Sequence, residues 1–154
     1  MRQNSISAGV ESSSGKSTVA SWLAQQIGAI HIRSDAVRKH MSGIALDQHG
    51  NESLYSFEKT KKTYCKMLEL ANDLTAQGLF VVLDATFAQK AFRGELINWA
   101  KNTKIILNFV QCSAPESVLI QRLKNRSHDV SDATEDLLPS QKISFDTICH
   151  DEKL

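Results

Sequence analysis

The sequence predicts a single α/β domain, residues 1–154, built around a parallel β-sheet. Short apolar segments alternate with longer segments of helical periodicity, and 154 residues suit one domain with one core. The hydrophobic content of 42% and charged content of 23% are ordinary for a globular protein. The formal net charge of +1 provides no overall electrostatic field that would attract DNA, RNA or a membrane surface, so stable binding to any of these is not expected. Any phosphate binding therefore requires a local site.

The first half of the chain alternates two strands with two helices. A weak strand precedes a serine-rich turn and a helix with one apolar face, which Gly28 can cap. A second short strand precedes a helix that Ser34 can cap. The expected apolar face of the first helix comprises Val19, Ala20, Trp22, Leu23 and Ile27. The expected segments are strands at 5–8 and 29–32 and helices at 17–27 and 34–41.

The second half begins, after a loop containing Gly50 and Asn51, with a long helix that Gly78 ends. An unbroken apolar run then predicts a strand buried on both faces, directly before Asp84. A helix, another strand and a helix with Pro115 in its first turn follow. The expected segments are helices at 53–78, 89–101 and 113–124 and strands at 79–83 and 104–110.

The segment that opens the first helix predicts a phosphate-binding loop for ATP. Backbone N–H groups and the positive end of a helix dipole suit phosphate oxygens, Lys16 adds a mobile charge, and the Ser17 hydroxyl can coordinate Mg²⁺. The pattern departs from G-x-x-x-x-G-K-[ST] at Val10, where the first glycine is expected, and we expect this to affect nucleotide affinity. The candidate nucleotide-binding residues in this loop are Ser13, Ser14, Gly15, Lys16, Ser17 and Thr18.

Asp35 and Arg38 are candidates for the acceptor side of a phosphotransfer reaction. They lie one helical turn apart after the second strand, at the carboxyl edge where ligands bind in parallel sheets. Asp35 could accept the proton of a substrate hydroxyl, and Arg38 could hold a substrate anion or the transferring phosphate. The alternative is an exposed ion pair near a helix start.

Three further positions fit such a site. Asp84, at the end of a buried strand, could hold Mg²⁺ directly or through water, or could cap the next turn. Arg122 and Arg126 could fold over the phosphates from a lid segment near 122–133, or could be cations placed favourably at a helix C-terminus. Arg93 could point back to the site from its helix.

The cysteine and histidine pattern argues against a metal centre of another kind. The three cysteines are widely spaced, and the five histidines form no ligand cluster with them. We expect a cytoplasmic protein with reduced thiols, because neither a signal peptide nor an apolar run long enough to span a membrane is visible.

Taken together, these motifs resemble the small P-loop kinase-like ATPases related to gluconate kinase, chloramphenicol phosphotransferase and the kinase domain of polynucleotide kinases. The resemblance implies a P-loop nucleoside triphosphate hydrolase fold with a parallel sheet of four strands in the order 2-3-1-4, often with a fifth. It also implies ATP and Mg²⁺. It assigns to Asp35 the deprotonation of the acceptor hydroxyl, to Arg38 a contact with substrate phosphate and to Arg126 the lid arginine. The resemblance rests on residues 14–20, 33–39, 81–87 and 122–133.

The leading hypothesis is therefore a kinase that transfers the γ-phosphate of ATP to a hydroxyl of a small molecule or nucleotide. Two alternatives are a nucleotide-binding regulatory module that has lost catalysis and a kinase of the zeta-toxin type. The acceptor pocket is expected between the second and third strands, within residues 36–64. Possible acceptor contacts there are Tyr55, Lys59, Lys61, Lys62 and Tyr64.

Overall fold

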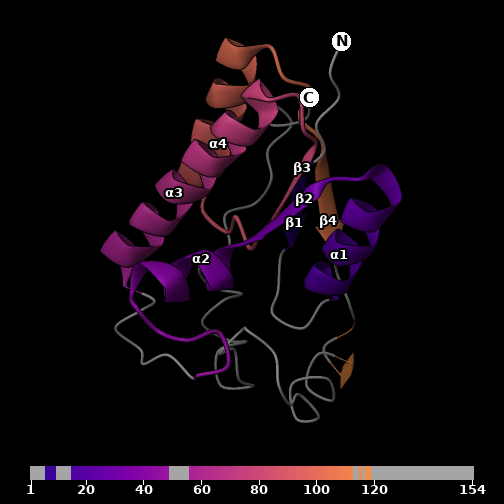
Figure 1. Cartoon of the computed structure of the whole chain (residues 1–154). Helices are drawn as coiled ribbons and strands as arrows, with labels where there is room; N and C mark the ends of the chain where they lie inside the picture. Colours follow the sequence, from indigo (N-terminus) through magenta and orange to yellow (C-terminus); the bar gives the residue numbers. More distant parts are fainter. Residues whose placement is uncertain (1–5, 10–14, 49–55, 113–114, 116, 119–154) are drawn as a thin grey trace.

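The computed structural model describes residues 6–9, 15–48, 56–112, 115, 117 and 118. Within these residues, four parallel strands form one sheet in the order β2-β3-β1-β4, which confirms an α/β fold with a parallel sheet (Figure 1). Three expected features would lie outside the described residues: a fifth strand, most of the helix at 113–124 and the lid near 122–133. The elements are β1 (Ile6–Gly9), α1 (Lys16–Ile27), β2 (Ile30–Arg33), α2 (Ser34–Met41), α3 (Phe57–Ala76), β3 (Val81–Ala85), α4 (Lys90–Thr103) and β4 (Phe109–Cys112).

Helices cover both faces of the sheet, and β3 lies between them. Every residue of β3 is buried, as the sequence predicts for a strand covered on both sides. Successive side chains of a strand point to opposite faces, so Val82 packs with α1 while Val81 and Leu83 pack with the core against α3 and α4 (Figure 1). This alternation places the side chain of Asp84 on the α1 side, where the predicted phosphate-binding loop ends.

The third and fourth strands begin two or more residues later than expected. β3 starts at Val81 because the preceding residues complete the end of α3: Gly78 has φ +86°, and the N–H of Leu79 donates to the carbonyl of Leu74. β3 also ends later than expected, at Ala85, so Asp84 lies within the strand instead of just after it. β4 starts at Phe109 because α4 continues to Thr103 and Lys104 takes a left-handed conformation at its end.

The helix caps follow the prediction in part. Gly28 caps α1 in the left-handed conformation, as expected. Ser34 is already the first residue of α2, with Arg33 at the cap position and no side-chain cap, so the predicted serine cap is wrong. The long helix α3 begins at Phe57, later than the expected Ser53, because the hydroxyl of Ser56 accepts a hydrogen bond from the backbone N–H of Lys59.

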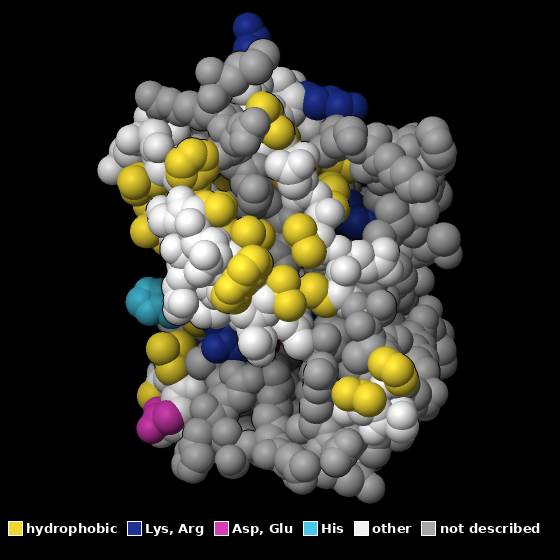
Figure 2. All heavy atoms as spheres, turned by 90° about the vertical axis from the view of Figure 1, so that its right-hand side faces the viewer, with side chains coloured by type: hydrophobic (Ala, Val, Ile, Leu, Met, Phe, Trp, Pro, Cys, Tyr) yellow, Lys and Arg dark blue, Asp and Glu magenta, His cyan; other side chains and the backbone are white. Residues whose placement is uncertain are grey.

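The buried face of α1 is rotated relative to the predicted one. Ala20 and Ala24 are buried against Val82, because two small side chains allow the helix to approach the sheet closely. Trp22, expected in the core, has 60% of its surface exposed. Hydrophobic side chains are accordingly visible on the side of the molecule where α1 lies (Figure 2). No helix in the described part of the chain has the length and apolar character needed to cross a bilayer.

Candidate active site

Gly15 and the first turn of α1 form the described part of the predicted phosphate-binding loop. Gly15 has φ +91°, a backbone conformation that favours glycine, and its carbonyl accepts the first hydrogen bond of the helix from Val19. The N–H groups of this first turn lack partners within the helix and carry the positive end of its dipole. Lys16, Ser17 and Thr18 occupy this turn, whereas Val10, Ser13 and Ser14 lie outside the described residues.

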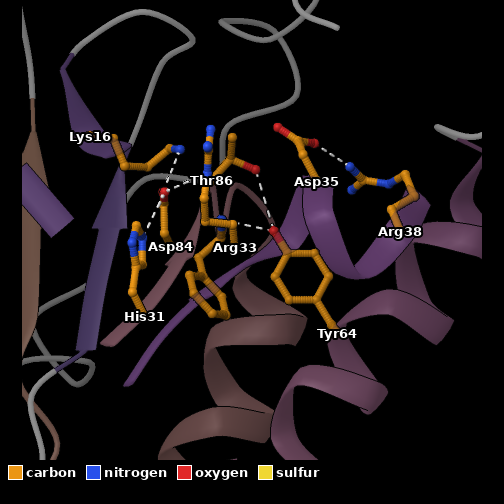
Figure 3. A network of polar contacts seen from close by, with 9 residues as sticks. Lys16, His31, Arg33, Asp35, Arg38, Tyr64, Asp84 and Thr86 are labelled. Carbon is orange, nitrogen blue, oxygen red and sulfur yellow. Dashed lines mark hydrogen bonds and ion pairs between the residues drawn. The ribbon is translucent and has the colours of Figure 1, made fainter. Parts of the chain in front are cut away.

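Lys16 and Asp84 form an ion pair at the centre of the site. The ammonium of Lys16 donates to Oδ1 of Asp84 at 2.7 Å, across 68 positions of the sequence (Figure 3). Asp84 is only 2% exposed, so solvent contributes little to stabilising its charge. The structure thus brings together the two residues that the sequence predicts for phosphate and magnesium binding.

Two residues of β2 complete the surroundings of Asp84, and the sequence analysis missed both. Nε2 of His31 lies 3.3 Å from Oδ2 of Asp84, and Nε of Arg33 lies 3.7 Å from the same oxygen. Arg33 is the register partner of Asp84, and His31 is two residues earlier on the same face of the strand. The alternation of Ile30 and Ile32 with these two polar residues is a signal that could have identified them.

The pKa of Asp84 reflects this ring of donors. Burial by itself raises the pKa, but the hydrogen bond from His31, the charge and hydrogen bond of Lys16 and the hydroxyl of Ser17 outweigh burial and hold the pKa well below its ordinary value. The carboxylate is therefore ionised at neutral pH and can only accept hydrogen bonds. It follows that Nε2 of His31 carries the proton that it shares with Asp84.

Asp35 and Arg38 form a second charged pair, in the first turns of α2. NH1 of Arg38 donates to Oδ1 of Asp35 at 2.5 Å, and Arg38 is 7% exposed. The pair is therefore not the fully exposed ion pair considered as an alternative. Both charges influence the phenol of Tyr64, which lies beside them on α3 (Figure 3).

The turn after β3 is fixed from two sides by buried side chains. The hydroxyl of Tyr64 accepts a hydrogen bond from the N–H of Phe87 and lies 3.3 Å from Oγ1 of Thr86. Arg93, which by its sequence position could point back to the site, is buried and donates through NH1 to the carbonyls of Phe87 and Ala88. Burial raises the pKa of Tyr64, so its hydroxyl stays protonated. These two hydrogen bonds of Arg93 both go to this turn.

The donor set fits a small hard cation such as Mg²⁺. The hydroxyl of Ser17 lies close enough to the carboxylate of Asp84 to lower its pKa, so two oxygen donors of the kind that Mg²⁺ prefers are near each other. Histidine, cysteine and carboxylate clusters of three or more are absent from the described residues. Such a site would hold the cation with one or two protein ligands and complete its coordination with water and phosphate oxygens.

The remaining candidates cannot be placed in the site. Arg122, Arg126 and Tyr55 lie outside the described residues. Lys59, Lys61 and Lys62 are exposed on α3, as a solvated helix face would be. Tyr64 is buried, and its hydroxyl is occupied by the turn after β3.

Comparison with known proteins defines the class of this chain. Residues 9–148 match the AAA domain family, so the chain belongs to that family. It is 30% identical over 140 residues to uncharacterized proteins of Mycobacterium tuberculosis and Mycobacterium bovis. The match covers 86% of this chain but 28% of those relatives, so the chain spans little more than a quarter of their length.

Among the solved structures that share this fold are three kinases. A gluconokinase from Sinorhizobium meliloti superimposes with a TM-score of 0.66 at 24% identity, over 95% of this chain and 76% of that one. A sugar kinase from Janibacter gives a TM-score of 0.71 at 18% identity, over 99% and 83%. An APS kinase of Mycobacterium tuberculosis, solved with AMPPNP and APS, gives 0.64 at 20% identity, over 79% and 68%. These likenesses show that the chain has the fold of these kinases.

Proposed function

We propose that the protein is an ATP-dependent kinase that transfers the γ-phosphate of ATP to a hydroxyl of a small molecule or nucleotide. The observation that carries this proposal is the contact between Lys16, at the start of α1, and Asp84, near the end of β3. It joins a phosphate-binding helix start to a buried carboxylate at the carboxyl edge of the sheet. The Asp35–Arg38 pair follows β2 at the same edge and supplies a base and an anion contact.

In this proposal, the first turn of α1 binds the triphosphate. Gly15 allows the backbone to approach the phosphates, and Lys16 exchanges Asp84 for the β- and γ-phosphate oxygens. Ser17 and Asp84 would hold Mg²⁺, which offsets the negative charge of the phosphates when it is bound. Ser13, Ser14 and Thr18 would add nucleotide contacts, and Arg122 and Arg126 would cover the phosphates from the lid segment.

Asp35 takes the proton of the acceptor hydroxyl as its oxygen bonds to the γ-phosphorus and the bond to ADP breaks. Arg38 holds the carboxylate of Asp35 in one orientation and offers its remaining donors to an acceptor or a transferring phosphate. The kinase folds of the structural neighbours, one of them solved with an ATP analogue, support this assignment.

The test is transfer of labelled γ-phosphate from ATP to sugars, nucleosides, antibiotics and 5′-hydroxyl oligonucleotides. We expect transfer to one class of acceptor, and we expect Asp35→Asn to lower its rate at least about 100-fold with ATP affinity retained. Asp73→Asn, an exposed aspartate on α3, is the matched control and should leave transfer unchanged. Absence of transfer to every acceptor, with ATP hydrolysis insensitive to Asp35→Ala, would contradict the proposal.

A nucleotide-binding regulatory module is the second candidate. It is favoured by the departure of the loop from the usual glycine pattern at Val10. Calorimetry distinguishes the two functions. Tight ATP binding that Lys16→Ala abolishes, without turnover in the presence of any acceptor, supports the regulatory module.

A further inference from the structure

We propose that His31 is a positioning residue that holds the carboxylate of Asp84 in place when Lys16 leaves it for the nucleotide phosphates. This inference rests on the proposed function, because it concerns the nucleotide-bound site. It assigns a role to a side chain of β2 that belongs to none of the motifs identified in the sequence. The observation behind it is the arrangement of partners around Asp84 (Figure 3).

The two oxygens of Asp84 have different partners. Oδ1 accepts from Lys16 at 2.7 Å, and Oδ2 faces His31 at 3.3 Å and Arg33 at 3.7 Å. When Lys16 turns to the phosphates, Oδ1 loses its closest partner and becomes available to a cation. The carboxylate is buried, so water cannot readily replace the lost contact, and the partners of Oδ2 then determine its orientation.

His31 is better suited than Arg33 to this task. Its Nε2 is within hydrogen-bonding distance of Oδ2, whereas Nε of Arg33 is beyond it. The histidine side chain has two rotatable bonds, and β2 pairs with β3 directly through the register His31–Val82 and Arg33–Asp84. Donor and acceptor are thus attached to adjacent backbones that are hydrogen-bonded to each other, so little freedom is lost when the contact forms.

Such a contact should act on the cation-dependent part of nucleotide binding. Partners that orient a metal-binding side chain contribute about 10- to 100-fold to metal affinity in other metal sites. In the proposed site the triphosphate would contact Lys16 and the helix start, whereas His31 contacts Asp84. The affinity for nucleotide without Mg²⁺ should therefore be independent of His31, and the gain in affinity caused by Mg²⁺ should depend on it.

The experiment compares His31→Leu with His31→Gln by calorimetry with a non-hydrolysable ATP analogue, in EDTA and in saturating Mg²⁺. Leucine removes the donor, whereas the amide of glutamine can place a donor close to the position of Nε2. The measured quantity is the dissociation constant in EDTA divided by the dissociation constant in Mg²⁺. We expect this ratio to be about tenfold lower in His31→Leu than in the wild-type protein, and to be close to the wild-type value in His31→Gln. His40→Leu, an exposed histidine on α2, is the matched control and should preserve the ratio.

The outcomes separate this inference from the proposed function. An unchanged ratio in His31→Leu overturns the inference and leaves the kinase proposal intact. A parallel loss of affinity in EDTA and in Mg²⁺, with lower thermal stability in both variants, indicates a structural role and also overturns it. Failure of the wild-type protein to bind the analogue, or of Lys16→Ala to weaken binding, overturns the proposed function and with it this inference.

Discussion

The hydroxyl of Tyr64 accepts a hydrogen bond from the backbone N–H of Phe87 at 3.0 Å and so joins helix α3 to the turn that follows β3. Phe87 has φ +44°, a conformation that bulky side chains rarely adopt, and its carbonyl accepts from Arg93. The strained residue is thus fixed on both sides. Thr86 precedes it directly and Asp84 lies three residues before it, so this turn shapes the edge of the sheet where the candidate site lies.

Replacing Tyr64 with phenylalanine tests one side of this arrangement. The variant keeps the stacked contact with Phe92 but leaves the buried N–H of Phe87 without its partner. We expect the free energy of unfolding to fall by about 1–3 kcal/mol, measured by urea denaturation. The control Lys66→Met removes an exposed hydrogen bond to Glu69 and should cost less. Equal losses in the two variants would argue against a special role for the Tyr64 hydroxyl.

Replacing Arg93 with methionine tests the other side. Methionine retains an unbranched stem but removes both donations to the carbonyls of Phe87 and Ala88. We expect a loss of about 2–4 kcal/mol in the free energy of unfolding, because two charge-assisted hydrogen bonds disappear from a buried site. Lys101→Met, an exposed change on the same helix, should have little effect. A stable Arg93→Met variant would show that Phe87 holds its conformation without these bonds.

The depressed pKa of Asp84 predicts a specific pH dependence of stability. Its folded-state pKa lies below the ordinary value of 3.8, so the unfolded state binds more protons in the acid range. The stabilisation from ionised Asp84 is therefore complete above about pH 5 and is lost as the pH falls toward the folded-state pKa. We expect Asp84→Asn to be less stable at neutral pH but to lose less stability on acidification.

Thermal unfolding between about pH 2 and 7 measures this difference. The exposed change Asp73→Asn should leave the acid limb of the stability curve as in the wild-type protein. If Asp84→Asn lost as much thermal stability on acidification as the wild-type protein, other carboxyl groups would be the cause of the acid sensitivity.

Lys16→Met tests the phosphate contact itself. Methionine removes the charge and keeps most of the side-chain volume. We expect affinity for an ATP analogue to fall at least about tenfold, since a hydrogen bond to a charged group contributes about 1.5–3 kcal/mol. Fluorescence or calorimetric titration measures it, with Lys101→Met as the matched control. Retained affinity would place the nucleotide elsewhere.

The sequence predicts the architecture because the determinants of the architecture are local. The apolar run that ends at Asp84 specifies a buried strand, and Gly28 specifies the end of the first helix. Both signals depend only on neighbouring residues, and the structure contains both elements. Strand starts are less predictable. β3 begins at Val81 because Leu79 bonds back to α3, and Lys104 ends α4 in a conformation that lysine rarely adopts.

The candidate site is predictable only where a residue belongs to a recognisable pattern. Lys16 and Asp84 follow from the loop and the strand, and the structure places them in contact. His31 and Arg93 do not, because their partners are decided by strand register and by the conformation of a turn. Trp22 shows the same limit, since the two alanines of α1 determine which face approaches the sheet.

The central position of β3 links the candidate site to the slowest motions of the molecule. Strands pair with β3 on both sides, and the backbone of Asp84 lies within this hydrogen-bonded ladder. Amide protons in such a strand exchange with deuterated solvent only when the domain opens as a whole. The amide of Asp84 should therefore exchange at the rate of global unfolding, so a substitution that loosens the distant core would be detectable as faster exchange at the site itself.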